Sequence, residues 1–252
     1  MQEDKLIVKK ALDTIAIAEK QYAVKSLGFL DPREEALINR EIRGMVPADI
    51  VCEFFGGTDE AERKMFICRP EYLETDYDEI ITALEITGRD ISSLSHRDYL
   101  GSLMGLGIKR ENIGDIVPVS DENKCYIFLK PAMLNYVGEN LTKIGRCGVR
   151  VSPRNLSEIQ VPEKPVKPIA ATVSSLRLDC LVSAATGLAR GKAADIIKSE
   201  RVKLNFEVTD GVSAALSEGD IISIRGFGRY RLSEIRGTTR KGRISVIIDK
   251  YI

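Results

Sequence analysis

The sequence has no tryptophan, one histidine, five scattered cysteines and no long apolar run. No stretch approaches the roughly 20 apolar residues that cross a bilayer, so we expect no membrane insertion. The cysteines are odd in number and never form a C-x-x-C pair, which indicates free thiols in a reducing cytoplasm. His96 has no second histidine with which to share a metal ion. We therefore predict a cytoplasmic protein with no metal and no cofactor.

Signatures of nucleotide-dependent catalysis are also missing. Gly101, Gly105 and Gly107 fall within or at the end of a predicted helix, whereas a dinucleotide-binding loop joins a strand to a helix start. The acidic residues of the middle region have no supporting constellation for acid–base chemistry. The residues thus favour a protein that is not an enzyme.

Charge is unevenly distributed although the net charge is zero. Residues 1–95 hold 12 Lys and Arg against 20 Asp and Glu, residues 96–169 hold 11 against 8, and residues 170–252 hold 14 against 9. An acidic beginning and a basic end fit a protein whose later domains face nucleic acid. The other interpretation is ordinary variation of charge along the chain.

Residues 1–75 are predicted to form a small α/β domain. Helical periodicity covers residues 5–43, with a break at Gly28 and a restart at Asp31 and Pro32, a good N-cap followed by a first-turn proline. Two strand-like runs follow, at residues 50–55 and 64–69. The acidic surface of this domain is a possible docking site for a protein partner.

Residues 76–154 show the order βαββαβ, which predicts a ferredoxin-like, RRM-like domain. Its second helix is expected over residues 132–144. Tyr126 and Phe128 alternate on a central strand, as base-stacking residues would, but without the basic-Gly-aromatic signature they are more typical of core positions. Four cations could form a second RNA-binding patch or a solvated rim: Lys109, Arg110, Arg146 and Arg150.

Residues 155–173 are predicted to be a linker. Pro162, Pro165 and Pro168 recur every three residues, which favours an extended polyproline-II spacer. The domain beyond it, residues 174–252, begins with two short amphipathic helices separated by Gly187, and continues as short strands.

Many cations are left on the outside of the helix pair and the strands after it. Guanidinium groups bind phosphate bidentately and helix N-termini add free amide donors, so this surface suits a polyanion. The predicted RNA-binding residues are Arg177, Arg190, Lys192, Lys198, Arg201, Lys203, Arg225 and Arg229.

These residues lie in a recognisable pattern. Arg177-Leu-Asp, Gly187-Leu-Ala-Arg-Gly-Lys-Ala, Arg201-Val-Lys-Leu-Asn and Glu218-Gly-Asp-Ile-Ile together resemble the S4-type RNA-binding domain over residues 174–225. The extension Arg225-Gly-Phe-Gly-Arg-Tyr-Arg-Leu and the middle-domain segment 96–116 are similar to the bacterial YlmH family.

The resemblance implies an α+β protein with a C-terminal S4-type domain and a β extension. It implies that Arg177 and Arg190, which open the two helices, contact RNA backbone. It further implies large-subunit rRNA and tRNA as partners, in rescue or quality control of stalled translation. We expect a monomer. An RNA-modifying enzyme carrying an S4 domain and a cell-division-associated adaptor protein are the alternatives.

The chain departs from the S4 pattern at three points. Ala189 stands where a capping serine is usual, Glu200 where a glycine is usual, and Asn205-Phe206 where Asn-Gly is usual. The last change predicts that a tight type I′ hairpin does not form there.

Overall fold

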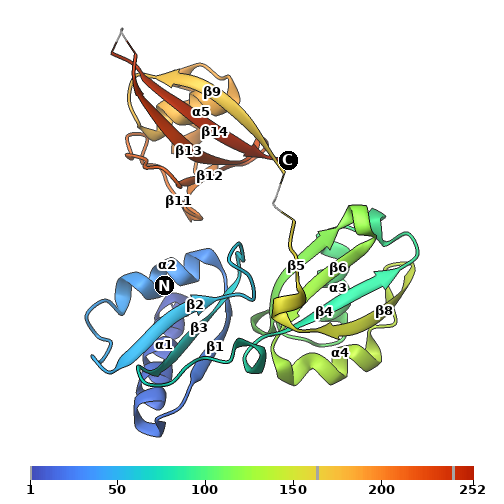
Figure 1. Cartoon of the computed structure of the whole chain (residues 1–252). Coiled ribbons are helices and arrows are strands. Elements are labelled where there is room, and N and C mark those ends of the chain that lie inside the picture. The colour runs from blue at the N-terminus through green and yellow to red at the C-terminus, as the bar shows by residue number, and fades with distance from the viewer. Residues whose placement is uncertain (1, 163–164, 240–241) are drawn as a thin grey trace. The chain divides into compact units, whose positions relative to one another are not determined.

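The computed structural model describes residues 2–162, 165–239 and 242–252, in two compact units, Met1–Pro162 and Glu163–Ile252 (Figure 1). Within these residues the chain forms six α-helices and three antiparallel sheets, which confirms the prediction of a mixed α+β fold. No helix in these ranges is long and apolar enough to cross a membrane. Glu163 and Lys164 of the predicted linker lie outside the described residues.

The first part of the N-terminal unit is a three-stranded sheet covered by two helices. Its elements are α1 (Gln2–Gln21), β1 (Lys25–Leu30), α2 (Pro32–Glu41), β2 (Ile50–Phe55) and β3 (Lys64–Pro70), with sheet order β1-β3-β2. Asp31 caps α2 in a capping box with Glu34, as the sequence indicated. The helical prediction for residues 5–43, with its break at Gly28, missed the strand β1, because pairing with β3 holds this segment extended.

The second part contains the predicted βαββαβ order with one additional two-residue strand, β7, before the last strand. Its main elements are β4 (Thr82–Gly88), α3 (His96–Gly105), β5 (Ile113–Val119), β6 (Lys124–Leu129), α4 (Leu134–Asn140), β7 (Lys143–Ile144) and β8 (Cys147–Arg154), with sheet order β5-β6-β4-β8-β7. The second helix is shorter than the predicted 132–144. Residues 131–133 form a 3-10 turn, and Lys143–Ile144 pairs with β8.

The two sheets of this unit share an apolar cluster. Phe29 of β1 and Met65 and Ile67 of β3 lie in it with Tyr126 and Phe128 of β6. Tyr126 is 4% exposed and Phe128 is 0% exposed. The sheet face on which RNA-recognition motifs stack bases is therefore covered here, and the core interpretation of these two aromatics is confirmed.

The C-terminal unit is a six-stranded sheet with α5 and α6 packed on one face. Its elements are β9 (Val166–Val173), α5 (Leu178–Thr186), α6 (Arg190–Lys198), β10 (Val202–Leu204), β11 (Glu207–Val208), β12 (Ile221–Ile224), β13 (Gly228–Thr238) and β14 (Ile244–Tyr251), with sheet order β11-β10-β12-β13-β14-β9. Leu181, Val182 and Ile197 of the helices are fully buried against Ile222 and Leu232 of the strands.

The predicted linker is wrong over Val166–Val173. This segment is β9, which pairs with β14 from Ile244↔Val173 to Tyr251↔Val166. Pro168 is compatible with a strand because β9 lies at the edge of the sheet, where a missing N–H breaks no central ladder. Pro168 therefore lies in an edge strand of the C-terminal unit.

Candidate nucleic-acid interface

The turn between α5 and α6 brings the two helix starts to one surface. Gly187 ends α5 with a left-handed φ of 73°, a conformation that glycine adopts without steric cost. The hydroxyl of Ser183 donates to the Leu188 carbonyl at 2.6 Å and fixes the turn. Arg177, the N-cap residue of α5, and Arg190, the first residue of α6, are thereby held on either side of Asp179.

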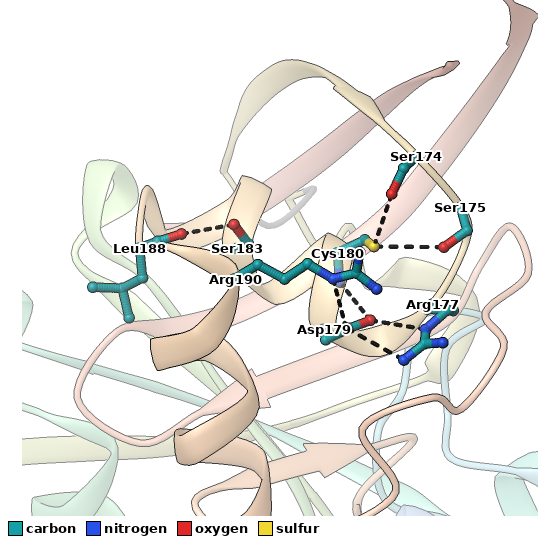
Figure 2. A network of polar contacts seen from close by, with 8 residues as sticks. All are labelled: Ser174, Ser175, Arg177, Asp179, Cys180, Ser183, Leu188 and Arg190. Atoms are coloured by element: carbon teal, nitrogen blue, oxygen red, sulfur yellow. Dashed lines mark hydrogen bonds and ion pairs between the residues drawn. The ribbon is translucent and has the colours of Figure 1, made fainter. Parts of the chain in front are cut away.

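Asp179 joins these two arginines, as Figure 2 shows. The Nε atom of Arg190 donates to Asp179 Oδ2 at 2.7 Å. The Nε and Nη2 atoms of Arg177 donate to the two carboxylate oxygens at 3.1 and 3.4 Å. The Asp179 side chain is 5% exposed, whereas those of Arg177 and Arg190 are 41% and 51% exposed. One buried carboxylate therefore orients two guanidinium groups that face solvent.

The charges of this network are mutually stabilised. Burial by itself would raise the pKa of Asp179, but hydrogen bonds from Arg190 and Arg177 outweigh burial, and its pKa lies below the usual value. The hydrogen bond to Asp179 raises the pKa of the Arg190 guanidinium. At neutral pH the cluster carries two positive charges and one negative charge, so it keeps a net attraction for an anion.

The terminal nitrogens of Arg190 are the donors that this network leaves open. Within the described part of the chain, Arg190 binds Asp179 through its Nε atom only. Its two Nη groups form a fork that matches two oxygens of a phosphate.

The start of α6 adds main-chain donors beside that fork. Ala189 is the N-cap and supplies no side-chain hydrogen bond, so the expected loss of a capping hydroxyl is confirmed. A side chain at Gly191 would meet nothing within 4 Å, which leaves the first turn open to an approaching group. By contrast, at the start of α5 the amides of Leu178 and Asp179 donate to the carbonyls of Ala214 and Val212. The α6 start is therefore the better phosphate site.

Lys192 and Lys198 lie on the exposed surface of the same helix. Lys192 is in the first turn, near the proposed phosphate position, and Lys198 is the last residue of α6. These two predicted binding residues therefore lie about 9 Å apart along the helix axis.

The other predicted cations lie together on the sheet, on the face away from the helices. Lys203 of β10 pairs with Ser223 of β12, which pairs with Arg229 of β13, so the three side chains share one face. Two residues along, the backbones of Arg201 and Arg225 are hydrogen-bonded, and Arg201 Nη2 donates to the Arg225 carbonyl at 3.2 Å. We call Arg201, Lys203, Arg225 and Arg229 the basic sheet face.

The β10–β11 hairpin corrects one prediction. Leu204 pairs with Glu207, so Asn205 and Phe206 form a two-residue loop, with φ of 47° and 70°. Positive φ at both loop residues is the requirement of a type I′ turn. The expectation that this turn is absent was therefore wrong. Glu200 likewise adopts φ 56° at the position where a glycine is usual.

The second predicted patch is divided by the structure. Lys109, Arg146 and Arg150 are exposed. Arg110 is half-buried, and its Nη1 donates to the carbonyls of Ile113 and Gly114 at 3.0 and 3.3 Å. Burial, followed by the charge of neighbouring Arg63, lowers the pKa of Arg110 to about 10. Its Nη1 group is thus used inside the N-terminal unit.

Sequence reasoning assigned no role to Asp179, Gly191 or Phe206. A signal for Asp179 was present, because it is a carboxylate between Leu178 and Cys180 on the apolar side of a short helix. A buried charge at that position needs a partner of opposite charge. Arg177 lies two residues before Asp179, and Arg190 follows it after the rest of α5 and the turn. The sequence marked Phe206 as a departure from the S4 pattern but did not indicate its role, because that role depends on the strand pairing on either side of it.

Comparison with known proteins finds a matching family model and a relative over nearly the full length. Residues 73–158 match the family described as "Putative RNA-binding domain in YlmH". The chain is 35% identical to the "Ribosome-associated protein quality control protein P2" of Bacillus subtilis (strain 168), over 99% of this chain and 96% of that protein.

A solved structure titled "Cell division protein ylmH from Streptococcus pneumoniae" has a similar fold. It superposes with a TM-score of 0.52 and 24% identity, covering 63% of this chain and 94% of that one. Because the relationship to the Bacillus subtilis protein extends over nearly the full length of both chains, this chain belongs to the YlmH family of RNA-binding proteins.

Proposed function

We propose that this protein binds rRNA of the large ribosomal subunit and tRNA, and acts without catalysis in rescue or quality control of stalled translation. The relative from Bacillus subtilis is named for ribosome association and quality control, and its likeness to this chain supports the same role here. The observation that carries the proposal is the pair Arg177 and Arg190, oriented by buried Asp179 at the open start of α6.

In this proposal the main phosphate contact is at the start of α6. The Nη fork of Arg190 takes two phosphate oxygens, the amides of the first turn point at the same group, and Lys192 adds charge. Arg177 binds an adjacent phosphate. Neither residue needs to move far, because Asp179 already fixes both guanidinium planes in the absence of RNA.

Two domain assignments belong to the proposal. Residues 174–252 form an S4-type domain extended by the β13–β14 hairpin, with β9 added at the sheet edge. Residues 76–154 form a ferredoxin-like, RRM-like domain, which is supported by the central position of its first and third strands, β4 and β6. Since its stacking face is covered, any RNA contact of this domain is through exposed cations such as Lys109, Arg146 and Arg150. The acidic surface of residues 1–75 remains a proposed docking site for a protein partner.

Co-sedimentation on a density gradient tests the function. The protein should migrate with large ribosomal subunits, and more of it with subunits that carry peptidyl-tRNA. Arg177→Ala with Arg190→Ala should release it. Wild-type protein that stays at the top of the gradient with large subunits, with and without peptidyl-tRNA, would overturn the proposal. Mass analysis of the recovered RNA should detect no modified nucleotide, and a modification that depends on the protein would favour an enzyme instead.

A further inference from the structure

Phe206 occupies a backbone position that suits it poorly. Its φ of 70° lies in the left-handed region, which a bulky side chain rarely adopts, and glycine would fit this turn position without strain. The turn is held in place by its other residue. Asn205 Nδ2 donates to Asp220 Oδ1 at 2.8 Å, and the amide of Ile221 donates to Asn205 Oδ1 at 2.9 Å. The strain at Phe206 is therefore imposed by a well-fixed hairpin.

Core packing does not explain the aromatic ring. Phe206 is half-buried and belongs neither to the buried core of its unit nor to the apolar side chains packed against that core. Its described ring partner is a cation, since the Arg229 guanidinium carbon lies 5.4 Å from the ring centroid. A strained backbone and a ring outside the core together point to a binding role.

The surroundings of the ring are basic. Phe206 lies in the loop after β10, the strand that carries Lys203 of the basic sheet face. Arg225 and Arg201 are exposed on that face. Two carboxylates lie close to the turn: Glu207 follows Phe206 directly, and Asp220 accepts hydrogen bonds from Asn205 and from the amide of Ser217. An occupant of this surface should therefore offer both a flat π-system and negative charge.

We infer that Phe206 and the basic sheet face bind an unpaired nucleotide of the RNA, with the base stacked on the Phe206 ring. Lys203 and Arg225 contact the flanking phosphates. Base–aromatic stacking tolerates any base, because every base has a π-face, so the site selects unpaired RNA and not a sequence. The inference rests on the proposed RNA binding and adds a second contact, on the opposite side of the sheet from the helix arginines.

Two substitutions in the full chain distinguish a loss of base stacking from a loss of folding. Phe206→Gly removes the ring and suits the positive φ, so the protein should stay folded and unfold at a higher temperature. Phe206→Tyr keeps a ring. The probes are a short RNA hairpin with 2-aminopurine at an unpaired loop position and a blunt RNA duplex of the same stem.

For the looped hairpin, Phe206→Gly should weaken binding by about five-fold or more, the lower end of what one stacked base contributes. Phe206→Tyr should bind like wild type. Binding of the blunt duplex should be equal in all three proteins. The 2-aminopurine fluorescence should be quenched by wild type and Phe206→Tyr, and not by Phe206→Gly.

The outcomes distinguish this inference from the proposed function. If Phe206→Gly binds and quenches like wild type, the stacking site is wrong and RNA binding stands. If wild type binds neither RNA, both ideas fall. If Phe206→Gly loses binding to polyglutamate while its RNA binding is unchanged, the surface belongs to an acidic protein partner, which also overturns the inference.

Discussion

Replacing Asp179 by Asn should weaken RNA binding although it removes a negative charge from the binding surface. In the native protein the buried carboxylate accepts hydrogen bonds from Arg177 and Arg190 and from the amide of Cys180. Asn keeps the shape and one acceptor oxygen, but its NH2 group would face guanidinium donors. Both arginines are then free to leave their fixed orientation.

The magnitude follows from two opposing effects. Ordering a long side chain on binding costs about 0.5–1.5 kcal/mol, so two released arginines cost about 1–3 kcal/mol. Removing the carboxylate charge strengthens the binding of a phosphate at this partly exposed surface by on the order of 0.5–1 kcal/mol. The net loss is about 1 kcal/mol, which is about five-fold in affinity.

The same substitution should destabilise the C-terminal unit. Hydrogen bonds to charged groups contribute about 1.5–3 kcal/mol each, but half-exposed guanidiniums regain water, so we expect about 1 kcal/mol for each arginine. A loss of about 2 kcal/mol corresponds to a fall of about 8–16 °C in the melting temperature of a unit of this size.

Asp249→Asn is the matched control. Asp249 is also buried in this unit, but its only ion pair among the described residues is with Arg231, at 3.2 Å, and away from the α6 start. Fluorescence anisotropy with a short RNA hairpin gives the affinities, and hydrogen exchange of the α5 and α6 peptides gives the local stability. If Asp179→Asn binds RNA as tightly as Asp249→Asn, or more tightly, only net charge matters and the positioning role is refuted.

Three further predictions concern stability. Glu200→Gly should stabilise the C-terminal unit by about 1 kcal/mol in thermal unfolding, because glycine adopts φ 56° at the end of α6 without steric cost, and no gain would contradict this. Gly114→Ala should destabilise the N-terminal unit by about 1–3 kcal/mol, because the new Cβ would lie 2.6 Å from the Phe29 ring. As a control, Gly101→Ala in α3 meets open space and should stabilise the same unit by about 0.5–1 kcal/mol. The pKa of Asp179 is lower in the folded than in the unfolded protein, so its contribution to folding stability is present above the unfolded pKa of about 3.9 and is lost as pH falls through the folded pKa. Asp179→Asn should therefore lose less stability than wild type when the protein is titrated with acid.

Local chemistry made the helix pair and most strands of this protein predictable. The cap at Asp31, the left-handed Gly187 and the turn-bounded runs of β5, β6, β12, β13 and β14 are signals confined to a few neighbouring residues. These signals depend only on neighbouring residues, so packing against distant parts of the chain does not change the structure that they predict.

Elements that depend on distant partners were the ones missed. β9 becomes a strand because β14, far along the sequence, pairs with it along its whole length. β1 resembled helix until its pairing with β3 was known. The turn at Asn205-Phe206 contradicts the preference of Phe because strand pairing and the side-chain bonds of Asn205 together impose it.

The candidate site likewise has parts that the sequence predicted and parts that depend on the fold. The types and spacing of Arg177 and Arg190 could be read from the sequence, but the carboxylate that unites them could not be assigned before α5 and α6 were placed. Arg110 looked equivalent to Lys109 in sequence, and only the fold turns its guanidinium toward the carbonyls of Ile113 and Gly114.

The salt dependence of RNA binding tests the role of the α6 start most directly. Each phosphate contact that is lost lowers the slope of log affinity against log salt concentration by about 0.7–0.9. Arg177→Ala with Arg190→Ala should therefore reduce the magnitude of the slope by about 1.4–1.8, measured on the full chain with one RNA hairpin. An unchanged slope would remove Arg177 and Arg190 from the interface and contradict the proposed phosphate site.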